Sequence, residues 1–118
     1  MRKIRVSKSF RLDVETLDKR ERQWVEKILR FLEDEQNSIE TLHQLFKPLQ
    51  AELKGYLKAK NRSFGLRLVF RILNAHEIEL MVERDEENSL LNVIIDIIGV
   101  GKRESIYGKV AQRIPHKG

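Results

Sequence analysis

Apolar residues change their spacing halfway along this sequence of 118 residues. In the first half they recur every three or four residues, which is the repeat of an amphipathic helix. In the second half they alternate with polar residues or run together, which is typical of β-strands. A sequence of this length can bury one core but not two, so residues 1–118 are expected to form one domain. The pattern predicts an α+β fold, with N-terminal helices on a twisted antiparallel sheet of four to five strands and a short C-terminal helix.

The first half predicts one strand and three helices. A short edge strand is expected over 2–6, and helices are expected over 8–17, 19–34 and 39–46. Ser7 is the expected N-cap of the first helix, and Asp18 with Glu21 forms a capping box for the second. The first two helices are predicted to form an antiparallel hairpin packed on the sheet. Pro48 is expected to end the third helix.

The second half predicts the rest of the sheet and the last helix. Strands are expected over 57–62, 66–73 and 90–98, and a helix over 103–114. Residues 77–84 fit either an extended arm or a helical turn, of which the strand is favoured. Ser63-Phe64-Gly65 is a predicted turn, and so is Gly99-Val100-Gly101. Residues 90–98 are nearly all apolar, which indicates a central strand covered on both faces. Asp96 within it is expected to be a hydrogen-bonded core or edge residue. The acidic stretch 74–89 contains a predicted polar turn at 85–88.

Several classes of protein are excluded by composition. The sequence has no cysteine, which excludes disulfides, thiolate zinc sites and cysteine nucleophiles. Its three histidines share no spacing that suggests metal ligation. No apolar run approaches the roughly 20 residues needed to span a bilayer, and the N-terminus contains no signal-peptide stretch. We therefore expect a cytoplasmic protein with no metal, no small-molecule cofactor and no membrane partner.

Positive charge is concentrated in two blocks. The formal net charge is +5, but residues 41–74 hold seven bases against one acid, and residues 99–118 hold five against one. An acidic block separates them. If the fold brings the two basic blocks together, they form a cationic patch suited to phosphates. The alternative is an ordinary solvated surface of mixed charge.

The arrangement of cations on the predicted strands favours the first reading. Lys58, Lys60 and Arg62 would share one face of a strand, next to Arg67 on the polar face of the following strand. The other face of that strand, formed by Leu66, Leu68, Phe70 and Ile72, is expected to hold the core. Like charges on adjacent strands are destabilising, and a bound phosphodiester would offset that cost.

The predicted last helix adds an arginine and a tyrosine to these cations. Arg103 and Tyr107 are four residues apart, so a helix turns both to one side. Cations can hold a scissile phosphate and stabilise its pentacovalent state, and they favour the anionic form of a tyrosine. Strand cations with an arginine–tyrosine pair are therefore sufficient for RNA cleavage without metal or histidine.

Three stretches of the sequence resemble the RelE branch of the RelE/ParE toxins of bacterial type II toxin–antitoxin systems. They are Leu53-Lys54-Gly55, the run KAKNRSFGLRLVF over 58–70, and the run IGVGKR over 98–103. The leading Ser7-Lys8-Ser9-Phe10 and the helical hairpin after it are also similar to that superfamily. The resemblance thus covers nearly the whole chain. The stretch 74–89 is longer than the hairpin turn usual in this family, and it is interpreted as an inserted arm or extended hairpin.

The resemblance implies a function and a set of site residues. RelE proteins are ribosome-dependent endoribonucleases (mRNA interferases), so the expected partners are a cognate antitoxin, the ribosome and its mRNA, with no cofactor. The catalytic residues implied by matching position are Lys58, Lys60, Arg67, Arg103 and Tyr107. Five further basic residues are predicted to contact RNA: Lys54, Arg62, Arg71, Lys102 and Lys109.

Two alternatives remain open at this point. A ParE-like toxin would inhibit DNA gyrase by binding and would not need the five catalytic residues. A catalytically silent basic RNA-binding domain would need the clustered cations but not Tyr107. The fold of the superfamily does not distinguish these possibilities.

Overall fold

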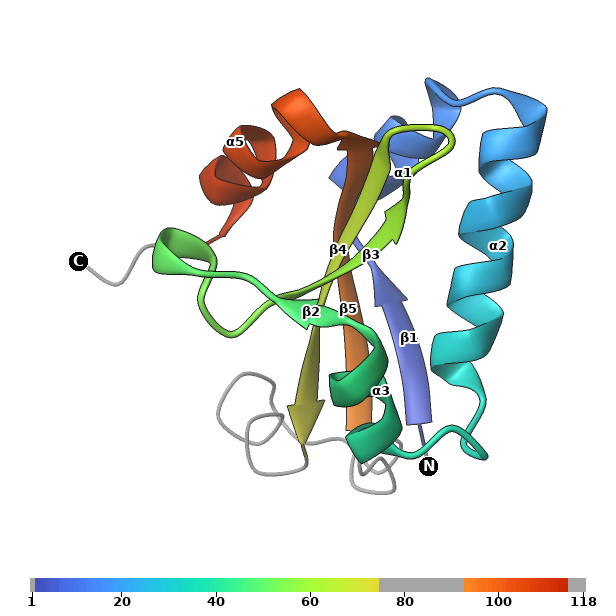
Figure 1. The fold of residues 1–118 in the computed structure, drawn as a ribbon, viewed down its shortest axis with the longest axis vertical. Coiled ribbons are helices and arrows are strands. Elements are labelled where there is room, and N and C mark those ends of the chain that lie inside the picture. Colours follow the sequence, from blue (N-terminus) through green and yellow to red (C-terminus); the bar gives the residue numbers. More distant parts are fainter. Residues whose placement is uncertain (1, 75–92, 115–118) are drawn as a thin grey trace.

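The computed structural model describes residues 2–74 and 93–114, which form one layered α+β fold (Figure 1). Along the chain the elements are β1 (Arg2–Val6), α1 (Lys8–Glu15), α2 (Lys19–Glu33), α3 (Ile39–Leu45), β2 (Lys47–Pro48), the 3-10 helix η1 (Ala51–Leu53), β3 (Leu57–Asn61), β4 (Leu66–Asn74), β5 (Val93–Lys102) and α5 (Arg103–Arg113). No helix in the described ranges is long and apolar enough to cross a membrane.

The five strands form one mixed sheet in the order β1-β5-β4-β3-β2. β1 runs parallel to β5, while β5, β4, β3 and β2 are antiparallel to their neighbours. The prediction of an antiparallel sheet is therefore wrong at one edge. Alternation identifies β1 as an edge strand but carries no information on its partner. The helices after β1 carry the chain to the opposite edge, and β1 is left to pair with the last strand.

The helix starts follow from their capping residues. Ser7 accepts a hydrogen bond from the Phe10 amide at 3.0 Å, and Asp18 and Glu21 form the predicted reciprocal capping box. The predicted helices and most of the strand ends agree with the structure to within two residues. Pro48 does more than end α3, because Lys47–Pro48 pairs with β3 as a short edge strand that sequence analysis missed.

The main core lies between the sheet and the N-terminal helices. Leu66, Leu68 and Phe70 of β4 are fully buried there, together with Leu32 of α2 and Leu42 of α3. The predicted core face of β4 is thus confirmed. Figure 1 shows α2 on this side of the sheet and α5 on the other.

The opposite face of β4 is also covered, which sequence analysis did not predict. Val69 is fully buried in a second, smaller core with Ile106 and Val110 of α5 and Tyr56. Because α5 packs there, the face that carries Arg67 is not simply a polar surface. Both central strands, β4 and β5, are therefore sandwiched between layers of side chains.

β5 continues through the predicted glycine turn. Gly99 and Gly101 pair with Val69 and Arg67 of β4 inside the sheet. A Cβ on Gly99 would lie 2.6 Å from Nη1 of Arg113. The same Nη1 forms an ion pair with Asp13 at 2.6 Å. These glycines are strand residues that allow close packing, so the turn prediction is wrong. Asp96 accepts hydrogen bonds from Arg5 and Arg71, each at 3.1 Å, which confirms its predicted hydrogen bonding.

Part of the prediction falls on residues outside the described ranges. These are the strand over 77–84, the polar turn at 85–88, the rest of the arm after Asn74, and the start of the strand predicted over 90–98. Asn74 itself is the last residue of β4.

Candidate functional site

The structure brings all five predicted catalytic residues to one cavity of about 620 Å³. They come from β3, β4 and α5, and Arg67 of β4 is 36 positions before Arg103 of α5 in the sequence. We call this cavity the cationic pocket, and its lining residues are Lys58, Lys60, Arg62, Gly65, Arg67, Arg103, Glu104 and Tyr107.

The β3–β4 hairpin positions the strand cations. Lys60 stands directly opposite Arg67 in the antiparallel register, and directly opposed side chains share a face. Lys58 is two residues before Lys60, so it lies on the same face, while Leu57 and Ala59 point into the core. Gly65 closes the hairpin turn at φ +67°, a conformation that favours glycine.

α5 completes the pocket because its first turn is tied to the hairpin. The Arg103 amide donates to the Gly65 carbonyl at 3.0 Å. Ile106 and Val110 are buried against the sheet, which leaves Arg103 and Tyr107 at the pocket. The Lys58 ammonium lies 5.8 Å from the centroid of the Tyr107 ring, a cation–π contact between β3 and α5.

Arg67 has an unusual environment for a charged side chain. The residue is 7% exposed, its Nη1 donates to the Leu66 carbonyl at 2.8 Å, and its Nε has no hydrogen-bond partner. A buried cation is costly unless an anion pairs with it. In the described residues no carboxylate forms an ion pair with Arg67. An anion bound in the pocket would supply the missing partner.

The pocket has a strong positive field. The charge of Lys47 on β2 is the largest cause that lowers the pKa of Lys60, followed by desolvation and the charges of Lys58, Arg62 and Arg67. Sequence analysis missed Lys47 because β2 was not predicted. It also missed Glu104, an exposed acid that follows Arg103 in the first turn of α5 and is the carboxylate among the lining residues.

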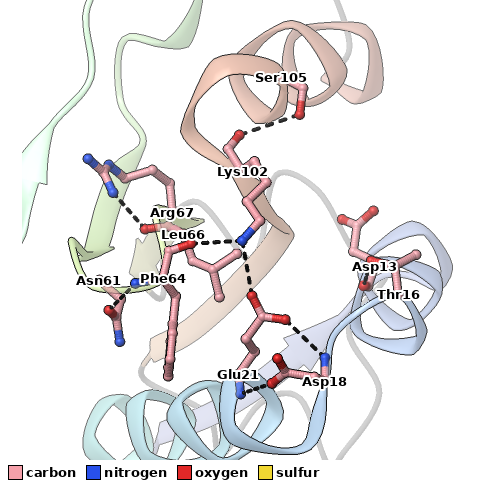
Figure 2. A network of polar contacts seen from close by, with 10 residues as sticks. All are labelled: Asp13, Thr16, Asp18, Glu21, Asn61, Phe64, Leu66, Arg67, Lys102 and Ser105. Atoms are coloured by element: carbon pink, nitrogen blue, oxygen red, sulfur yellow. Dashed lines mark hydrogen bonds and ion pairs between the residues drawn. The ribbon is translucent and has the colours of Figure 1, made fainter.

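Four of the five predicted RNA contacts lie elsewhere, and only Arg62 lines the pocket. Lys102 turns to the opposite side of β5, where its ammonium donates to Glu21 at 3.2 Å and to the Phe64 carbonyl at 2.8 Å (Figure 2). Lys109 lines a separate cavity with Lys102. Arg71 pairs with Asp96 and stacks on Tyr56. Lys54 is exposed after η1. Within residues 2–74 and 93–114 no three acidic, His or Cys side chains form a metal-binding group.

Comparison with known proteins supports a fold assignment. No protein-family model matches the chain, and the search of curated proteins gave no match. Among solved structures, a variant of the E. coli toxin RelE in the free state matches with a TM-score of 0.59 and 20% identity, over 95% of this chain and 96% of that chain. The toxin–antitoxin complex RelBE2 from Mycobacterium tuberculosis matches with a TM-score of 0.51 and 23% identity, over 86% and 96%. The chain has a RelE-like fold.

Proposed function

We propose that this chain is the toxin of a type II toxin–antitoxin system and that it cleaves translated mRNA on the ribosome. The observation that carries the proposal is the buried guanidinium of Arg67, whose Nε lacks a partner, within a pocket lined by four other cations and a tyrosine. Such a pocket fits a phosphodiester. The RelE-like fold supports the same function, since one matching structure is a RelE toxin.

In the proposed reaction the nucleophile is a 2′-hydroxyl of the RNA substrate itself. The 2′-oxygen forms a bond to the adjacent phosphorus, and the bond from phosphorus to the 5′-oxygen breaks. Tyr107 reacts as the phenolate, which takes the proton of the 2′-hydroxyl and becomes a neutral phenol. The Lys58 ammonium beside its ring is placed to balance the negative charge of the phenolate. Arg67 stabilises the pentacovalent phosphorane, which carries more charge than the ground state.

Lys60 is the proposed proton donor to the leaving 5′-oxygen. Arg103, which lines the same pocket, is proposed to lie near that oxygen. The pKa of Lys60 is lowered mainly by the charge of Lys47, and a lower pKa makes an ammonium a better acid near neutral pH. In this mechanism the clustered cations provide the charge stabilisation that metal ions provide in other nucleases, so the proposed reaction is independent of metal.

An antitoxin is the second proposed partner. The RelBE2 structure is a complex of a toxin with its antitoxin. A strongly cationic pocket attracts acidic, disordered segments that fold on binding. We propose that a cognate antitoxin binds this chain and suppresses its activity.

The test is induced expression of this chain followed by mapping of mRNA 5′ ends. It is done with and without the product of the neighbouring gene, which is the expected antitoxin. Cuts positioned by codon in translated mRNA, which disappear when the antitoxin is co-expressed, are the expected result. DNA breaks that depend on gyrase would instead identify a ParE-like inhibitor. Bound RNA without either product would identify a silent RNA-binding domain.

Arg67→Ala connects the activity to the pocket. Loss of one preorganised donor should lower single-turnover cleavage on programmed ribosomes by about 100- to 1,000-fold. Arg11→Ala is the matched control, because Arg11 is exposed on α1 and lies away from the pocket. Unfolding curves of both variants separate a catalytic loss from a folding defect. Wild-type cleavage by Arg67→Ala would contradict the proposed site.

A further inference from the structure

Lys47 is a cation beside the pocket, and the proposed mechanism uses it only through its effect on the pKa of Lys60. It lies on β2 directly opposite Lys58 in the antiparallel register. Directly opposed residues on neighbouring strands point to the same face of a sheet. Lys47 is therefore on the face that carries Lys58, Lys60 and Arg67, one strand further toward the sheet edge.

The charge of Lys47 acts on the pocket and has no partner of its own among the described residues. Lys47 lowers the pKa of Lys60 more than any other cause, ahead of desolvation and of Lys58. Its side chain is exposed, and no carboxylate in residues 2–74 and 93–114 forms an ion pair with it. Like charges directly opposite each other weaken a strand pair, so the Lys47–Lys58 pair opposes the pairing of β2 with β3. An anion between the two ammonium groups would reverse that effect.

We propose that Lys47 and Lys58 form a second phosphate subsite, which binds the backbone phosphate adjacent to the one held by Arg67 and Lys60. The proposal rests on the proposed RNA-cleaving function. Lys58 and Lys60 are two residues apart on β3, which is a separation of about 6.6 Å along the strand. The face thus presents positive charge at two successive positions to an extended RNA strand. Because the contacts are to phosphate, this subsite binds without regard to base sequence.

Salt dependence of binding measures the number of phosphates contacted. The affinity for a single-stranded RNA oligonucleotide is measured as salt rises, for the wild type, Lys47→Gln, Lys47→Arg and Arg67→Ala. Each phosphate contact on single-stranded RNA contributes about 0.7 to the slope of log affinity against log salt. We expect Lys47→Gln to lower the slope by about 0.7 and Lys47→Arg to keep it. Lys27→Gln is the control, since Lys27 is exposed on α2, which packs on the other side of the sheet.

The outcomes separate this inference from the function on which it rests. A wild-type slope for Lys47→Gln, with a reduced slope for Arg67→Ala, would overturn the second subsite and leave the proposed function standing. Unchanged slopes for both variants would overturn both. The same assay on mRNA-programmed ribosomes tests the source of the phosphate, because a slope change seen only there would assign the contact to ribosomal RNA and overturn the subsite for the substrate strand.

Discussion

Arg67 occupies a position that packing alone would give to an apolar residue. Its neighbour on the same face of β4, Val69, is fully buried, and Ile106 of α5 covers that face. A guanidinium there loses hydration, and one of its three nitrogens gains no partner in exchange. The residue therefore weakens the free protein and prepares a rigid donor for an anion, which is the compromise expected at a functional site.

The proposed role of the Tyr107 hydroxyl as general base can be tested by removing a single oxygen atom. Tyr107→Phe keeps the ring and its contact with Lys58 and removes only the hydroxyl. If Tyr107 is the general base, single-turnover cleavage on programmed ribosomes should fall by about 100- to 10,000-fold with an unchanged melting temperature. Tyr56→Phe is the matched control, because Tyr56 is buried in the second core and burial raises its pKa. Cleavage at the wild-type rate by Tyr107→Phe would remove the tyrosine from the mechanism.

At the scale of elements, the sequence pattern predicts helix starts and hairpins, which depend on neighbouring residues. It does not predict which distant strands pair with each other. Helix starts are encoded by caps such as Ser7, and the β3–β4 hairpin is encoded by alternation around a short turn. The local pattern thus places Lys58, Lys60 and Arg67 on one face, whereas joining Arg103 and Tyr107 to them as one set of site residues rests on the family resemblance. β2 is too short to show alternation, and the parallel partner of β1 lies about ninety residues away in sequence. Neither could be predicted from local spacing.

The misplacement of Lys102 has a specific cause in β5. Val69 pairs with Gly99 and Phe70 with Ile97, so Ile98 is an extra residue on β5. A β-bulge of this kind inverts the alternation of side chains beyond it. Ile95 and Ile97 face the main core before the bulge, and Val100 faces it afterwards, with Lys102 on the same side. Sequence spacing does not reveal the bulge, so it gives no sign that Lys102 points away from the pocket.

The new position of Lys102 predicts a structural role. Glu21 is 8% exposed, and Lys102 connects it to the β3–β4 turn that borders the pocket. Figure 2 shows this connection between α2 and the turn at Phe64. Because the Lys102 side chain is half exposed, we expect Lys102→Met to lower the free energy of unfolding by only about 1–2 kcal/mol. The salt slope of RNA binding should not change.

A double-mutant cycle with Glu21→Gln checks this role of Lys102. Urea unfolding of both single variants and the double variant should give a coupling energy of at least about 0.5 kcal/mol. An RNA contact would produce the opposite pattern, with unchanged stability and a salt slope smaller by about 0.7. That pattern would contradict the structural assignment.

At the scale of the whole molecule, stability and binding are divided between the two faces of the sheet. The large core and the N-terminal helices lie on one face, and α5 with the cationic pocket lies on the other. The pocket face can therefore carry unpaired cations without disturbing the main core. In the proposed function its cations recognise phosphate, which every nucleotide has, so they would hold an RNA strand without fixing which bond lies in line for attack.

The proposed dependence on the ribosome follows from this lack of positioning. One tyrosine and a few cations give modest acid–base power, and a misplacement of about 1 Å can lower a rate about 100-fold. We expect single-turnover cleavage of an mRNA bound to the ribosome to exceed cleavage of the same free RNA by at least about 100-fold, at one salt concentration and with saturating protein. Arg67→Ala should lose both activities, which excludes a contaminating nuclease. Equal rates with and without ribosomes would mean that the protein itself aligns the strand, and the chain would then be a general ribonuclease rather than a ribosome-dependent one.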